Sequence, residues 1–116
     1  MQRQTPEGVV LACDFCGTDW DMEIPMIEGH KGSILCLNCL ARAIDEAKDA
    51  TEGFMCTMCR QDYDAGQKCY APIDRPANVN PDAVICWDCL QQADRTFARD
   101  KDTEWERRID PTKKWR

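Results

Sequence analysis

Eight of the nine cysteines in this 116-residue chain form C-x-x-C pairs, a residue type and spacing suited to metal binding. Two cysteines separated by two residues can present both thiolates to one ion, and a second pair from a distant segment completes a tetrahedron. The pattern therefore predicts two four-thiolate sites, each with Zn²⁺ as the expected ion and iron as the alternative. The four pairs are Cys13/Cys16, Cys36/Cys39, Cys56/Cys59 and Cys86/Cys89.

The two halves of the chain read as copies of one unit, which favours sequential pairing of the cysteines. The segment SILCLNCL at 33–40 aligns with AVICWDCL at 83–90, and each follows an earlier C-x-x-C pair. Site 1 would then use the first two pairs and site 2 the last two. The alternative is a cross-braced, RING-like arrangement, which would join the first pair to the third and suggest a ubiquitin-type partner surface.

The elements that must position the sulfurs can be predicted from local patterns. Apolar residues recur at helical spacing after the second pair of each half, so a helix should begin there. Its unpaired N–H groups and positive dipole end favour anionic sulfur. The first pair should lie in a tight turn, and Gly17 directly after Cys16 suits such a knuckle. The helical positions are Leu37, Leu40, Ile44 and Ala47, then Leu90, Ala93 and Phe97.

These elements predict a small, metal-stabilised α+β protein made of two tandem treble-clef-like zinc fingers. Each finger would contain a zinc knuckle, a short β-hairpin and a C-terminal helix. Each half has roughly 50 to 60 residues, a size at which an apolar core alone gives little stability and a metal supplies the rest. The predicted units are a four-cysteine finger at 1–52, a second with an inserted loop at 53–99, and a basic, aromatic extension at 100–116.

The first half resembles the N-terminal zinc-binding domain of the ClpX protein-unfolding chaperone. The likeness is carried by CDFCGT at 13–18, MIEG at 26–29 and SILCLNCL at 33–40, about a third of the chain. The resemblance implies a treble clef that dimerises and docks other proteins, with Cys13, Cys16, Cys36 and Cys39 as metal ligands. The second half would be a divergent copy. The chain contains no G-x-x-x-x-G-K-[ST] motif for nucleotide binding.

Two copies in one chain suggest an internal pseudo-dimer, with a homodimer as the other possibility. We expect the face carrying Leu40 and Ile44 to pack against the face carrying Leu90 and Phe97. Such packing would leave the chain a monomer.

Charge separates the body of the chain from its end. Residues 1–94 carry 7 Lys and Arg against 16 Asp and Glu, a net charge of −9, whereas residues 95–116 carry a net charge of +3. Four thiolates around a divalent ion add further negative charge, so the body should repel phosphate. No apolar stretch could span a bilayer and no secretory signal is recognisable, so we expect a reduced, cytoplasmic protein without disulfides.

Cys69, His30 and the C-terminal extension are expected to have structural roles. Cys69, the unpaired thiol, is expected as a small buried or half-buried side chain in a hairpin, with a ligand or redox role as the alternative. His30, the only histidine, is expected in a solvated loop. The extension should pack Phe97, Trp105 and Ile109 along one face of a continued helix that ends near Asp110.

The leading functional hypothesis is a non-catalytic zinc module that binds other proteins. Four thiolates leave no open position for catalysis at the metal. A nucleic-acid-binding or transcription-associated protein acting through the basic, Trp-containing tail is the second hypothesis, and a thiol redox enzyme the last. Apolar side chains around the knuckles and in the tail are candidate partner contacts. They are Phe15, Trp20, Met26, Met58, Trp105 and Trp115.

Overall fold

The computed structural model describes residues 2–20, 24–72 and 80–109, and shows a small α+β protein with two helices and several short sheets. Helix α1 spans Leu37–Glu46 and helix α2 spans Trp87–Arg99. Both begin where the sequence predicts, directly after the first cysteine of the second C-x-x-C pair in each half, Cys36 and Cys86. In the described ranges neither helix has the length and apolar composition needed to cross a membrane.

Each half contains an antiparallel hairpin that leads into its helix. Strand β3 (Met26–Glu28) pairs with β4 (Ile34–Cys36), and β8 (Lys68–Tyr70) pairs with β9 (Ile85–Cys86). Met26 lies opposite Cys36 in the first hairpin, as Cys69 lies opposite Cys86 in the second. The internal repeat is therefore structural, and Cys69 is the counterpart of Met26.

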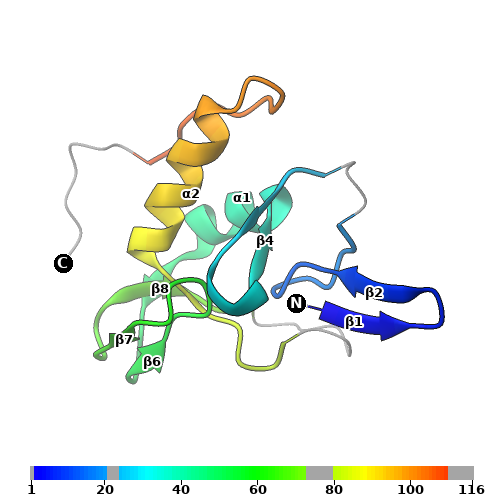
Figure 1. Cartoon of the computed structure of the whole chain (residues 1–116). Helices are drawn as coiled ribbons and strands as arrows, with labels where there is room; N and C mark the ends of the chain where they lie inside the picture. The colour runs from blue at the N-terminus through cyan, green and yellow to red at the C-terminus, as the bar shows by residue number, and fades with distance from the viewer. Residues whose placement is uncertain (1, 21–23, 73–79, 110–116) are drawn as a thin grey trace.

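The remaining strands surround these two units. An N-terminal hairpin, β1 (Gln2–Thr5) and β2 (Gly8–Leu11), lies on the side of the molecule away from α2 (Figure 1) and was not predicted. Strands β6 (Phe54–Met55) and β7 (Asp62–Tyr63) flank the second knuckle, and β5 (Lys48–Asp49) follows α1. Strand β5 pairs with β8, so a segment from residues 1–52 completes the sheet of the second half. A 3₁₀ turn at His30–Gly32 joins β3 to β4.

The two halves share one hydrophobic core. Helices α1 and α2 lie in contact (Figure 1), and Leu40 and Leu90 are fully buried in the same cluster. Phe97 is also buried there, whereas Ile44 is half-buried against it. The expected packing of the two helical faces is thus observed, with Ile44 at its margin.

Contacts between the knuckle of one half and the hairpin of the other reinforce this core. The rings of Phe15 and Tyr70 lie 6.4 Å apart between centroids. In the equivalent contact, between the hairpin of the first half and the knuckle of the second, the His30 N–H donates to the Met58 carbonyl oxygen at 2.8 Å. A Cβ at Gly29 would lie 2.7 Å from that oxygen, so the close approach requires glycine.

The prediction that α2 continues towards Asp110 is wrong, because the helix ends at Arg99. The Asp100 carboxylate accepts hydrogen bonds from the Asp102 N–H at 3.0 Å and the Thr103 hydroxyl at 2.8 Å. Such local bonds offer the backbone an alternative to the helix and stabilise a turn. The chain then folds back along α2, where Trp105 packs on Phe97 and Ile109 is buried. The expected packing is present, but without helical structure.

Asp94 on α2 holds this returning segment. Its side chain is fully buried and accepts hydrogen bonds from Trp105 Nε1 at 2.9 Å, Arg108 N at 2.9 Å and Ile109 N at 3.0 Å. The Arg107 guanidinium lies 3.8 Å away and supplies a positive charge. A buried carboxylate is stable only with such compensation, so Asp94 and residues 105–109 form one interdependent unit.

We predict that Asp94→Asn lowers the free energy of unfolding by roughly 2 to 4 kcal/mol. The amide turns one acceptor into a donor that faces the N–H groups around it, and removes the charge that pairs with Arg107. Urea denaturation followed by tryptophan fluorescence measures the loss. Asp88→Asn, an exposed position on the same helix, is the control and should change stability by less than about 0.5 kcal/mol. Equal effects of the two substitutions would contradict this role of Asp94.

Candidate metal centres

The four cysteine sulfurs of the first half converge on one point. Cys13 and Cys16 come from the knuckle after β2, Cys36 ends β4, and Cys39 lies in the first turn of α1. Sγ of Cys13 and Sγ of Cys39 are 3.8 Å apart, and those of Cys16 and Cys36 are 3.6 Å apart. Zinc–sulfur bonds of about 2.3 Å in a tetrahedron require sulfurs about 3.8 Å apart. The cage therefore fits a tetrahedral thiolate-bound ion.

The second half builds the same cage from the same elements. The Cys56 and Cys89 sulfurs lie 3.7 Å apart, and those of Cys59 and Cys86 lie 3.9 Å apart. In each cluster all four sulfurs lie within 4.8 Å of one another. Both clusters combine cysteines of one half only, so pairing is sequential and the cross-braced alternative is wrong. Either cluster could hold a metal ion.

Backbone N–H groups point at the sulfurs. Cys13 Sγ accepts from Phe15 N and Cys36 N, each at 3.4 Å, and Cys36 Sγ accepts from Cys39 N at 3.4 Å. In the second half Cys86 N donates to Cys56 Sγ and Cys89 N to Cys86 Sγ, again at 3.4 Å. Cys36 and Cys86 are also the N-cap residues of α1 and α2. These dipoles favour negatively charged sulfur.

Mutual contact drives the pKa values of the sulfurs apart. The hydrogen bond with Cys13 is the largest cause lowering the pKa of Cys16 far below its usual range, and the bond with Cys13 is also the largest cause raising that of Cys39. In the second half, contact with Cys56 raises the pKa of Cys86 to about 12. Without a cation the four sulfurs share protons, because four thiolates so close together repel. A divalent ion removes this repulsion and releases the protons.

A buried polar residue ties each knuckle to the strand that carries the third ligand. Asp14 N donates to the Ile34 carbonyl at 2.9 Å, and Ile34 N donates to Asp14 Oδ1 at 3.0 Å. Thr57 and Val84 repeat this pair of bonds at 2.8 and 3.0 Å. Sequence analysis missed both residues. The available signal was that the residue after the first cysteine carries a short side-chain oxygen in both copies.

The knuckles differ in how they close. Gly17 has φ +78° and its N–H donates to the Cys13 carbonyl at 2.9 Å, as expected for a glycine after the second cysteine. Arg60 holds the equivalent place with φ +62° and an N–H bond to the Cys56 carbonyl at 2.9 Å. A left-handed conformation is unfavourable for a residue with a Cβ. The second knuckle is therefore strained where the first is not.

The other predicted site residues lie outside the two cages. His30 is exposed, and its backbone N–H rather than its ring makes the contact with Met58. Cys69 is a buried residue of β8, as expected for a hairpin side chain, and burial raises its pKa. Neither joins a metal cluster among the described residues.

The candidate partner contacts divide into buried and half-buried groups. Phe15 and Met58 are 2% and 6% exposed, because each knuckle packs against the opposite half of the molecule. They are therefore not available at the surface, and this part of the expectation is corrected. Trp20, Met26 and Trp105 are half-buried. Trp115 lies outside the described residues.

We predict that Cys13→Ser/Cys39→Ser binds one metal ion where the unaltered chain binds two. Under sequential pairing both substitutions remove ligands from one cage, whereas under cross-braced pairing they would remove one ligand from each. Native mass spectrometry of the zinc-loaded proteins reports the count. Cys69→Ser is the matched control and should retain two ions. Complete loss of metal from the double variant would contradict the assignment.

We also predict that Arg60→Gly raises the free energy of unfolding by about 0.5 to 1 kcal/mol, because glycine removes the left-handed strain. Thermal unfolding of the zinc-loaded protein measures the change. Arg60→Ala keeps the strain while removing the guanidinium, so it should give no gain. A gain of equal size in the alanine variant would show that charge, not backbone conformation, limits this knuckle.

Comparison with protein-family models, with curated proteins and with solved structures found no match to this chain. The likeness of the first half to the ClpX domain is thus a likeness of motif alone.

Proposed function

We propose that this chain is a non-catalytic, two-zinc protein that binds other proteins, with each half a treble-clef finger. The observation that carries the proposal is the closed geometry of the cages. Each brings four cysteine sulfurs to tetrahedral spacing, and four sulfurs leave no coordination position for water or substrate. Zinc suits such a cage because it imposes no competing geometric preference. Nine unbridged thiols fit a reducing, cytoplasmic setting.

The packing of the two halves supports a monomeric internal pseudo-dimer. Phe15, Met58 and Leu90 are buried in one cluster to which both halves contribute residues. The apolar surface that an isolated finger could use for dimerisation is therefore buried between the two halves of the chain. Any partner has to bind elsewhere on the surface.

A nucleic-acid role through the basic tail is the weaker candidate. Two of the three cations in the described part of that tail make internal contacts: Arg107 pairs with Asp94, and Arg108 lies 4.5 Å from the centre of the Trp105 ring. The Trp105 indole donates to Asp94, so this ring is also engaged. Residues 1–94 carry a net charge of −9, which repels phosphate.

The experiment that tests this function compares peptide and nucleic-acid binding by the zinc-loaded protein. We expect selection from a displayed library of random 12-residue peptides to enrich binders, and chelation to abolish their binding until zinc is restored. Single-stranded DNA should not bind at low salt. Failure to enrich peptides, together with DNA binding that falls steeply with salt and is lost on deletion of residues 100–116, would support the nucleic-acid alternative instead.

A further inference from the structure

The two related hairpins differ at their outer edges. In the second half the sheet order is β5-β8-β9, so β8 has a neighbour on each side. In the first half β3 pairs with β4 alone among the described residues. An unpaired edge presents backbone N–H and C=O groups that can accept another strand.

Register identifies which groups of β3 face outwards. Leu37 N donates to the Pro25 carbonyl at 2.9 Å, and Gly29 N donates to the Ser33 carbonyl at 2.8 Å. Bonded and non-bonded pairs alternate in an antiparallel ladder, so Met26 and Glu28 direct their backbone groups away from β4. Cys69, the counterpart of Met26, has Lys48 of β5 opposite it on that side.

The asymmetry has a cause in the chain. After α1 the chain turns back as β5 and covers the edge of β8. Helix α2 has 13 residues against 10 in α1, and the chain beyond it is held on α2 by Asp94. The segment that would cover β3 by analogy with β5 is therefore fixed elsewhere.

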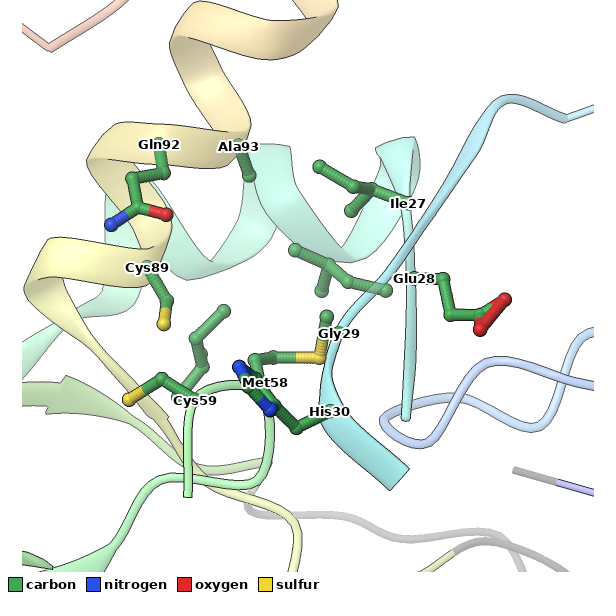
Figure 2. A pocket seen from close by; sticks show the side chains of 11 residues that line it. Ile27, Glu28, Gly29, His30, Met58, Cys59, Cys89, Gln92 and Ala93 are labelled. Atoms are coloured by element: carbon green, nitrogen blue, oxygen red, sulfur yellow. The ribbon is translucent and has the colours of Figure 1, made fainter. Parts of the chain in front are cut away.

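A cavity of about 360 Å³, whose wall also includes Cys59 and Cys89 of the second cage, adjoins the open edge. Figure 2 shows Ile27 facing Gln92 and Ala93 of α2 across the opening, with Met58 and His30 at one end. The His30 N–H, the next outward-facing group after Glu28, donates to the Met58 carbonyl. The cavity thus lies on the side to which the free edge of β3 points.

At the seam, the boundary where the two halves pack together, the repeat accounts for the space beside Ile27 and Met58. Ile27 lies opposite Leu35 as Tyr70 lies opposite Ile85, so Ile27 and Tyr70 are counterparts. Met58 and Phe15 are counterparts in the two knuckles. On one side two aromatic rings, Phe15 and Tyr70, fill the seam. The smaller side chains of Met58 and Ile27 leave space on the other.

We propose that β3 and this cavity form a docking site for an extended segment of a partner protein. The inference rests on the proposed protein-binding function and names its site. The partner strand pairs with the outward groups of Met26 and Glu28, as β5 pairs with β8, and inserts an apolar side chain between Ile27 and Ala93. Half-buried Ile27 is the wall that an aliphatic or aromatic side chain would contact, above a buried apolar floor of Leu35, Ile85 and Met58.

The charge of this surface indicates which residues should flank the apolar residue of the partner segment. Glu28 is exposed at the rim of the cavity, where its side chain extends outwards (Figure 2), and alternation along β3 directs it to the face opposite that of Ile27. Alternate residues of an added strand would point to the same face as Glu28, where a Lys or Arg would form a cross-strand pair. With a net charge of −9 over residues 1–94, the body of the chain favours a basic partner segment.

The test uses the full zinc-loaded chain and a displayed library of random 12-residue peptides. We expect enriched peptides to carry an apolar residue flanked by Lys or Arg. Glu28→Pro removes one outward N–H and should weaken their binding about tenfold relative to Glu28→Ala, which keeps the N–H and removes the same charge. Ile27→Tyr introduces the side chain of the counterpart Tyr70, closes the cavity and should also weaken binding about tenfold. Retention of two zinc ions by each variant shows that its fold is intact.

Three outcomes would overturn the proposal in different ways. Peptides that bind all variants equally would place their site elsewhere, while the protein-binding function would stand. A dimer of the unaltered chain that Glu28→Pro converts to a monomer would identify a second copy as the occupant of the edge. Selection that enriches no peptide would contradict both the proposed protein-binding function and the proposed site.

Discussion

The convergence of four sulfurs in each half is the constraint on which the rest of the structure depends. A knuckle, a hairpin and a helix N-terminus must meet so that the sulfurs lie within 4.8 Å of one another. Backbone N–H groups at 3.4 Å and the buried Asp14 and Thr57 hold those elements in place. Because such small units bury little apolar surface alone, the metal cages and the shared core together must stabilise the chain.

The internal repeat and the departures from it account for the differences between the surfaces of the two halves. The two halves keep the same cage, the same hairpin register and the same helix start, but they differ in what surrounds β3 and β8. In the second half β5 pairs with the outer edge of β8, and Tyr70 packs near Phe15 at the seam. In the first half β3 has no such neighbour among the described residues, because the chain after α2 is held on that helix by Asp94. Departures from the repeat, more than the repeat itself, therefore mark where a partner could bind.

Sequence predicted the cages and their supporting helices because those features are local: C-x-x-C spacing and helical periodicity can be read within a few residues. The packing of one half against the other could not be predicted from such local patterns. Phe15 and Met58 look like exposed apolar residues until the opposite half is placed against them. The end of α2 was missed because the bonds made by Asp100 and Asp94 compete with a helical pattern that continues in the sequence. Strand β5 has only two residues, too few to show a period.

The most direct test of the central claim is X-ray absorption fine structure at the zinc edge of the purified, metal-loaded protein. Both cages consist only of cysteine sulfur, so the spectrum should fit four sulfur neighbours at about 2.3 Å around the average zinc, with no nitrogen or oxygen. A spectrum that requires nitrogen or oxygen neighbours would contradict the account. It would mean that a residue such as His30, or water, completes a site and that the cages are not closed.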